Sequence, residues 1–306
     1  MTNSSAASVV EQALSIAARS GDDLLAIVGP TATGKTALAV ALAERLGGEV
    51  VSADSVQIYR AFDVGSGKPD AVELARAPHH LVGTLDPLDR ADAALWAADA
   101  ARAIAEIRGR GRVPIVCGGT FLWVKALLFG LAAAPPGNDA IRDRHRAIAE
   151  RDGRPSLHAA LGAVDPPTAA RLHPNDFVRV SRALEVHELT GKPMSEWQRE
   201  HAFGTIRHPA RVLALACPPA VLTERITLRA RRWLAAGWAD EVRGLIDAGY
   251  GEARAMASVG YAQVRASLAN RIAPADLEAA IVRATRVFAR RQRTWLQRAD
   301  VTWLGP

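Results

Sequence analysis

The chain has 306 residues, of which 49% are hydrophobic and 23% charged. This composition is typical of a globular protein with a sizeable core and excludes a disordered chain. No apolar run approaches the roughly 18 residues of a membrane-spanning helix. We expect no secretory signal, because the first twenty residues lack a basic start and include Glu11. Cys117 and Cys217 lie in unrelated contexts, which excludes a disulfide framework and favours a cytoplasmic protein.

In chain order, residues 1–23 are predicted to be a leader that is partly disordered. The apolar run at 24–28 (LLAIV) then predicts a strand buried on both faces. A glycine-rich segment and a helical segment follow it. Further strands are predicted at 49–53, 113–117 and 213–217, with a helix from about 91 to 108. Strands that alternate with helices predict an α/β fold, a P-loop NTPase-like parallel sheet flanked by helices.

The pattern changes between residues 130 and 207. Strand-like runs are missing there, and prolines and charged residues separate short helical pieces. We therefore predict a helical insertion domain, 130–207, within an α/β core formed by 24–129 and 208–306.

The strongest motif follows the first predicted strand and opens a helix. It matches the pattern GxxxxGK[ST], whose glycines let backbone N–H groups converge on an oligophosphate at a helix N-terminus. Lys35 would reach the phosphates, and the Thr36 hydroxyl would ligate Mg²⁺. The motif leaves open which phosphate compound binds and whether a phosphoryl group is transferred. Its residues are Gly29, Pro30, Thr31, Ala32, Thr33, Gly34, Lys35 and Thr36.

Asp54 follows the second predicted strand, at the edge where open α/β sheets bind ligands. It could orient a metal or substrate, as in a small-molecule kinase, or act as a base for an incoming nucleophile. The alternative is a helix N-cap, since Asp54-Ser55 begins a new element. Gly118, Gly119 and Thr120 follow another strand at the same edge, whereas the pair His79-His80 is interpreted as structural.

The net charge of +6 is modest, but its distribution is informative. Six arginines and no acid lie between Arg283 and Arg298, with Phe288 and Trp295 among them. Such a helix can neutralise phosphates while its aromatic side chains stack or pack. The alternative is a solvated face with the aromatic side chains in the core.

Several motifs together resemble the tRNA dimethylallyltransferases, also called tRNA isopentenyltransferases. The most specific are DSxQxYR at 54–60, NDxxRxxRALEV at 175–186 and RRQxTW at 290–295. Others are Lys68-Pro69, the segment 78–81, Gly118-Gly119-Thr120 and Val259-Gly260-Tyr261. The resemblance extends from about residue 24 to 303. Departures from the family pattern are Phe121, Trp123, Ala262 and Gln297, which suggest a reshaped pocket or weaker phosphate contact rather than another reaction.

The resemblance implies transfer of a dimethylallyl group from dimethylallyl diphosphate to the exocyclic N6 amine of adenosine 37 in tRNAs. The P-loop, 29–36, would hold the donor diphosphate, with Mg²⁺ as cofactor and Thr36 as its protein ligand. Asp54 would be the general base, and Lys35, Thr36 and Arg229 would complete the catalytic set. The partner would be the anticodon stem-loop of tRNA, and we expect a monomer that does not associate with membranes.

The family also implies a set of tRNA contacts spread over the chain. These are Asp54, Ser55, Val56, Gln57, Thr120, Arg142, Val178, Arg179, Val180, Ser181, Arg182, Ser258, Val259, Gly260, Tyr261, Arg290, Arg291, Gln292, Arg293, Thr294, Trp295, Leu296 and Gln297.

Three alternatives remain open from the sequence. A P-loop small-molecule kinase that uses ATP would explain the P-loop and Asp54, but not the arginine-rich C-terminal segment. An RNA-binding protein without catalytic activity would bind tRNA without forming product. An isopentenyltransferase that acts on free adenine nucleotide would not need RNA contacts from the insertion.

Overall fold

A computed structural model of the protein describes residues 3–297 and 299–305. The chain forms two compact units, one of residues 1–128 with 207–306 and one of residues 129–206. We call them unit 1 and unit 2. The second unit interrupts the first, and its limits lie within one residue of the insertion predicted from the sequence.

In the described part of the chain, six strands form one parallel sheet in unit 1, in the order β3-β2-β4-β1-β5-β6. All five residues of the central strand β1 are buried, as expected for a strand covered on both faces. The fold is that of a P-loop NTPase. The strands are β1 (Leu24–Val28), β2 (Gly48–Ser52), β3 (His79–His80), β4 (Val113–Gly118), β5 (Ala210–Leu215) and β6 (Thr302–Leu304).

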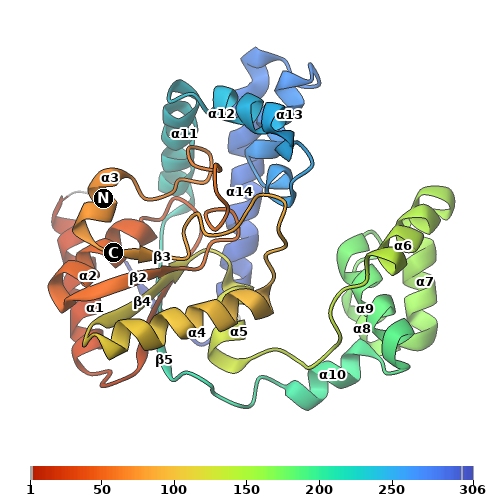
Figure 1. Ribbon diagram of the computed structural model, residues 1–306, viewed down its shortest axis with the longest axis horizontal. Coiled ribbons are helices and arrows are strands. Elements are labelled where there is room, and N and C mark those ends of the chain that lie inside the picture. The colour runs from red at the N-terminus through yellow and green to blue at the C-terminus, as the bar shows by residue number, and fades with distance from the viewer. Residues whose placement is uncertain (1–2, 298, 306) are drawn as a thin grey trace. The chain divides into compact units, whose positions relative to one another are not determined.

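Helices cover both faces of this sheet (Figure 1). Helices α1 (Asn3–Ala18) and α2 (Lys35–Leu46) pack on one face, where Leu25 and Ile27 of β1 point. On the other face lie α4 (Ala93–Gly109) and α5 (Phe121–Phe129), whose residues Trp96 and Trp123 stack with their ring centroids 5.3 Å apart. The sheet is thus buried on both sides, which leaves its carboxyl edge for ligands.

The leader expected to be partly disordered is helix α1. Its residues Val9 and Ala13, one helical turn apart, are buried in the same core cluster as α2 and the sheet. One small apolar stripe is thus enough to dock this helix on the core of unit 1. Residues 1 and 2 lie outside the described part. Strands β3 and β6 were not predicted from the sequence.

Beyond the carboxyl edge, α11 (Pro219–Ala235) and α14 (Leu277–Leu296) lie side by side (Figure 1). Helices α12 (Trp238–Leu245) and α13 (Tyr261–Leu268) contact each other at the end of this pair that is remote from the sheet (Figure 1). The shorter elements of unit 1 are helix α3 (Ala71–Arg76), the π-helical turn Ile246–Tyr250 and the 3₁₀ turns Arg254–Ala257 and Pro274–Asp276.

Unit 2 is helical throughout its described elements. Its own core includes Leu157, Leu161, Val180 and Leu184. Its helices are α6 (Asp139–Asp152), α7 (Arg154–Val164), α8 (Pro166–Arg171), α9 (Phe177–Thr190) and α10 (Met194–His201).

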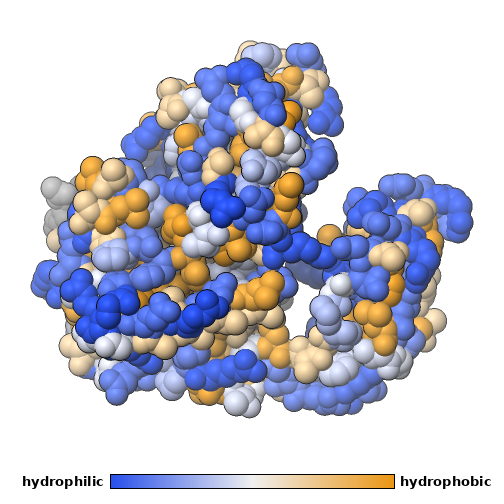
Figure 2. All heavy atoms as spheres, viewed as in Figure 1, coloured by the Kyte–Doolittle hydropathy of each residue, from blue (hydrophilic) through white to orange (hydrophobic). Residues whose placement is uncertain are grey.

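Among the described residues, no helix has the length and apolar character needed to cross a bilayer. Hydrophilic side chains cover most of the face that is visible in Figure 2, and hydrophobic ones are scattered among them.

Candidate active site

The P-loop closes on itself at the start of α2. Gly34 has a φ of 99°, a backbone conformation that favours glycine, and α2 begins at the next residue. The Thr33 hydroxyl and the Lys35 ammonium both donate to the Pro30 carbonyl, at 2.9 and 2.8 Å. These bonds hold the loop around the N-terminus of a 12-residue helix, where backbone N–H groups and the helix dipole favour an anion.

Arginines from α11 reach this loop from a distant part of the sequence. Arg229 donates to the Thr31 hydroxyl at 2.6 Å and lies over the Trp233 ring, 4.5 Å from its centroid. Arg225 donates to the Thr33 carbonyl at 3.3 Å. The P-loop therefore has cations on a second side, besides the lysine that the motif supplies.

Two of these cations are partly buried, at an energetic cost. Burial lowers the pKa of Lys35 to about 8, with a further contribution from the Arg229 charge, although Asp54 opposes the shift. Burial also lowers the pKa of Arg229 to about 10, again against the attraction of Asp54. An anion bound between them would offset the cost of keeping both groups charged.

Asp54 lies two residues after the end of β2, at the carboxyl edge of the sheet. Its Oδ1 accepts hydrogen bonds from the N–H groups of Val56 and Gln57, at 2.9 and 3.2 Å. Asp54 thus caps a turn at 54–57 rather than a helix. Both bonds use the same oxygen, and no described residue donates a hydrogen bond to Oδ2.

The ends of β2 and β4 are joined beside this carboxylate. The Thr120 hydroxyl accepts from the Ser55 N–H at 3.1 Å, and the Thr120 N–H donates to the Ala53 carbonyl at 3.1 Å. A Cβ at Gly118 would lie 2.1 Å from that carbonyl oxygen, so a residue without a side chain is needed there. The close approach of the two strand ends fixes Asp54 and Thr120 relative to each other.

These groups meet in one cavity of unit 1. Arg229 and Thr31 belong to its lining, as does the Asp54 carboxylate, and Trp233, Trp238 and Phe288 supply aromatic surface. Trp238 Nε1 and Ser258 Oγ are buried and have no hydrogen-bond partner among the described residues. The predicted site residues found in this lining are Thr31, Asp54, Ser55, Val56, Thr120, Arg229, Ser258, Val259 and Gln292.

Other predicted residues lie outside the lining and contact the segments that form it. Gln57 Nε2 donates to the carbonyls of Ser66 and Gly67, at 3.2 and 2.8 Å. The Tyr261 hydroxyl donates to Glu241 at 2.7 Å. A Cβ at Gly260 would lie 2.1 Å from the Trp238 ring, so this glycine allows the close packing of α12.

Gln292 on α14, one of the predicted RNA contacts, forms hydrogen bonds with two loops of unit 1. Its Oε1 accepts from the Thr31 N–H at 2.9 Å, and its Nε2 donates to the Gly119 carbonyl at 2.9 Å. One side chain thus ties α14 to the P-loop and to the loop after β4.

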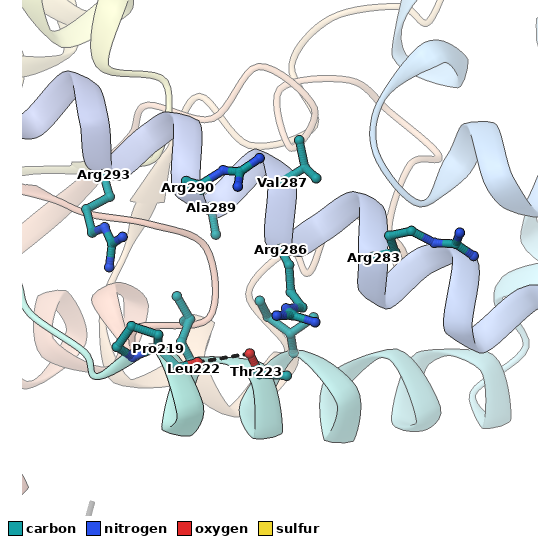
Figure 3. Close-up of a pocket in the computed structure, with 10 residues that line it drawn as sticks. Pro219, Leu222, Thr223, Arg283, Arg286, Val287, Ala289, Arg290 and Arg293 are labelled. Atoms are coloured by element: carbon teal, nitrogen blue, oxygen red, sulfur yellow. Dashed lines mark hydrogen bonds between the residues drawn. The ribbon is translucent and has the colours of Figure 1, made fainter.

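The arginines of α14 lie on another face of the helix. Successive residues of an α-helix are about 100° apart around its axis. Thr285, Phe288 and Gln292 therefore share the face toward the cavity, and no arginine of α14 belongs to the cavity lining. Four of the arginines line a groove against the first half of α11, next to Leu222 and Thr223 (Figure 3). No hydrogen bond or ion pair joins their guanidinium groups to another described residue. They are Arg283, Arg286, Arg290 and Arg293.

The rest of the predicted C-terminal stretch is divided between surface and core. Arg291, Thr294, Trp295 and Gln297 are exposed, whereas Leu296 is buried in the interior. Arg298 lies outside the described residues.

In unit 2 the predicted tRNA contacts are divided in the same way. Arg142 and Arg182 form ion pairs with the fully buried Glu185, at 2.9 and 2.6 Å. Val180 and Ser181 are buried, whereas Val178 is 75% exposed and Arg179 pairs with Asp176 on the surface. In the free protein, Val178 and Arg179 are therefore the predicted contacts of this helix that are most accessible.

The sequence prediction missed two tryptophans of the cavity. Neither Trp233 nor Trp238 is among the predicted site residues, although both line the cavity; Trp238 is only 1% exposed. Arg229 and Trp233 are four residues apart on a helix, a spacing that places side chains on one face and could have indicated their contact.

Comparisons with known proteins agree with this arrangement. A family model described as IPP transferase matches residues 57–299, and one described as isopentenyl transferase matches residues 22–80. A tRNA dimethylallyltransferase of Sorangium cellulosum is 60% identical over 283 residues, which are 92% of this chain and 90% of that protein.

Solved structures give the same result. The tRNA isopentenylpyrophosphate transferase of Bacillus halodurans superposes with a TM-score of 0.67 at 34% identity, covering 92% of this chain and 89% of that one. A eukaryotic dimethylallyltransferase, whose structures show it acting on tRNA, superposes with a TM-score of 0.73 at 26% identity, over 92% and 73% of the two chains. The IPP transferase model covers more than half of the chain, and the second model covers the P-loop and Asp54, so the chain belongs to the IPP transferase family of tRNA dimethylallyltransferases.

Proposed function

We propose that the protein transfers the dimethylallyl group of dimethylallyl diphosphate to the N6 amine of adenosine 37 in tRNA. The observation that carries this proposal is the cavity in which Thr31, Arg229 and Asp54 meet. It combines an anion cradle, a carboxylate and an apolar wall, which are the three environments that a prenyl diphosphate and an amine require.

The reaction follows from the placement of these groups. The adenine N6 lone pair is delocalised into the ring, so the amine is a weak nucleophile. As N6 bonds to the allylic carbon, the bond from that carbon to the diphosphate oxygen breaks, and the diphosphate leaves with the electron pair. Asp54 accepts the N6 proton, for which Oδ2 is available because the turn uses Oδ1.

The cationic cradle stabilises the leaving group. Negative charge accumulates on the diphosphate as the carbon–oxygen bond breaks. Lys35, Arg229 and the P-loop N–H groups are already in place and partly removed from water, so they stabilise this charge without reorganisation. The aromatic surface of Trp233 and Trp238 would shelter the allylic carbon from water.

The donor set around the P-loop fits a magnesium ion. The described residues hold no group of three His, Cys, Asp or Glu side chains that could bind a metal alone. Mg²⁺ is instead commonly held by one or two protein oxygens together with substrate phosphates and water. We propose that the Thr36 hydroxyl, which forms no hydrogen bond with another described residue, holds the ion together with the donor diphosphate. The bound ion would add positive charge beside the diphosphate.

For RNA, we propose that phosphates contact the four groove arginines of α14 and Arg179, which lies beside the exposed Val178 at the start of α9. Recognition of an RNA loop depends on such backbone contacts and on bases that leave the stack. The target adenine must be extruded to reach Asp54, at a cost of about a few kcal/mol.

A single assay tests this proposal against its alternatives. The protein is incubated with labelled dimethylallyl diphosphate, Mg²⁺ and unmodified tRNA, and the nucleosides are analysed by mass spectrometry. We expect label on N6 of adenosine 37. ATP turnover without prenylation would support a kinase, label on AMP in preference to tRNA would support a nucleotide isopentenyltransferase, and tRNA binding without product would support an RNA-binding protein.

The Asp54→Asn variant tests the assignment of the base. The amide oxygen of asparagine can still accept the Val56 and Gln57 N–H groups, so the turn is retained. Without a proton acceptor, we expect kcat to fall about 10²- to 10⁴-fold, with tRNA affinity nearly unchanged. Asp54→Ala, which also removes the cap, should be at least as impaired. Turnover of wild-type magnitude in Asp54→Asn would exclude Asp54 as the base.

A further inference from the structure

A loop with no motif-based role forms part of the cavity wall. Gly65 and Ser66, in the segment 63–66, belong to the lining. The segment rests directly on α12, since a Cβ at Gly65 would lie 1.8 Å from Trp238 Nε1. Any shift of this loop would therefore change the shape of the cavity.

The loop is held by the carboxylate of Glu241, on α12. Oε2 accepts from the N–H groups of Asp63 and Val64, at 2.9 and 2.6 Å, and Oε1 accepts from that of Gly65 at 3.3 Å. Three successive N–H groups that converge on one anion form a nest. No ion pair of Glu241 is found among the described residues, so the carboxylate is held by backbone and hydroxyl donors.

The same carboxylate binds a third part of the wall. Oε1 also accepts from the Tyr261 hydroxyl at 2.7 Å, and burial together with the Glu241 charge raises the pKa of Tyr261, which keeps this donor protonated. Ser258 and Val259, just before Tyr261 in the chain, line the cavity. Glu241 thus joins the loop, α12 and the start of α13.

A chain of hydrogen bonds continues from the loop to the proposed base. Gln57 Nε2 holds the carbonyls of Ser66 and Gly67, and the Gln57 N–H donates to Asp54 Oδ1 at 3.2 Å. The loop therefore lies between Glu241 on one side and the turn that Asp54 caps on the other.

We propose that Glu241 is a positioning residue for prenyl transfer: by binding the nest at 63–65 it fixes the cavity wall and, through Gln57, the orientation of Asp54. This inference rests on the proposed function. The Glu241 carboxylate does not belong to the cavity lining, so its effect on the reaction passes through the loop.

The test is a double-mutant cycle between Glu241→Gln and Asp54→Asn, with kcat and the KM for each substrate measured in the prenylation assay. Glutamine has one acceptor oxygen in place of two and turns an NH₂ group toward the nest. We expect Glu241→Gln to lower kcat about tenfold or more while the Kd for tRNA changes less than threefold. Because the effect passes through Asp54, adding Glu241→Gln to Asp54→Asn should lower kcat by less than twofold more.

Two further variants complete the test. Glu278→Gln makes the same chemical change at a surface pair with Arg231 and should leave kcat unchanged. Gly65→Ala displaces the loop from Trp238 without altering the carboxylate. It should lower kcat, and its effect should also be non-additive with that of Asp54→Asn. This variant keeps the proposal testable if Glu241→Gln does not fold. Its control is Gly244→Ala, at a helical position of α12 with open space around it.

Wild-type kcat in a folded Glu241→Gln, or a full additive loss in the double variant, would overturn the proposal and leave Glu241 a purely structural residue. Absence of prenylation by the wild-type protein would instead overturn the proposed function itself, so the two failures are distinguishable.

Discussion

Lys35 illustrates how a single residue sets the conditions for donor binding. Its ammonium group donates to the Pro30 carbonyl and shares a buried region with Arg229. Two cations so close to each other and to the protein interior are costly until an anion binds. The lowered pKa of Lys35 is therefore a sign of a site built for a polyanion.

This gives a pH dependence with a defined sign. Lys35 has a pKa of about 8, so it loses its charge as the pH rises through 8. Only the charged form attracts diphosphate, and kcat/KM for the donor should fall above pH 8, by up to tenfold per unit. Lys35→Arg should move this decline to higher pH, because arginine stays protonated.

Lys192→Arg serves as the control, since Lys192 pairs with Glu200 in unit 2, and it should leave the profile unchanged. A decline above pH 8 that persists in Lys35→Arg would assign the titration to another group.

Individual residues were predictable from the sequence where a motif prescribes the backbone. The P-loop and Asp54 are such cases, because their positions follow from strand ends and a helix start that lie close to them in the chain. Trp238 and Glu241 were missed because they contact the segment 63–65, more than a hundred residues away in the chain. Composition and local spacing carry no record of such contacts.

At the scale of elements, α14 serves two purposes on two faces. One face closes the cavity and binds the P-loop through Gln292, and the other presents arginines in the groove beside α11. The sequence predicted an arginine-bearing helix here, but not which side chains face the site. A motif such as RRQ places neighbouring residues on different faces, and only the packed helix reveals which is which.

Gln292→Ala should loosen the attachment of α14 to the P-loop. It removes two hydrogen bonds, each with a net contribution of about 1 kcal/mol, so we expect the free energy of unfolding to fall by about 2 kcal/mol. The KM for the donor should rise as well, because the Thr31 N–H loses its partner.

Denaturant unfolding and donor titration measure both effects. Gln297→Ala, at the exposed end of the same helix, is the matched control and should change stability by less than about 0.5 kcal/mol. An unchanged donor KM in Gln292→Ala would mean that α2 and the loop geometry hold the P-loop without α14.

The predicted elements differ from the observed ones mainly at the edges of the sheet. Four strands with apolar runs were predicted within a few residues of their limits. Strands β3 and β6 are short, at two and three residues, and an edge strand of that length has no recognisable period. They are strands because their backbone groups pair with β2 and β5, respectively.

Over the whole molecule, the distribution of charge is more informative than the net charge of +6. Arg45 and Arg76 are examples of arginines already neutralised, by Glu11 and Glu44. The four groove arginines of α14 extend over about 15 Å of helix, and their guanidinium groups form no hydrogen bond or ion pair with another described residue. A nucleic-acid strand in a duplex has one phosphate per about 3.4 Å of axis, so the groove can face several phosphates.

Replacing two groove arginines should therefore change how tRNA binding depends on salt. For Arg286→Gln with Arg290→Gln, we expect weaker tRNA binding and a slope of log K against log salt that is shallower by about 2. Arg45→Gln with Arg76→Gln removes the same net charge from paired positions and should leave the slope unchanged. Equal slopes in the two double variants would mean that only net charge matters, and that the groove does not contact RNA.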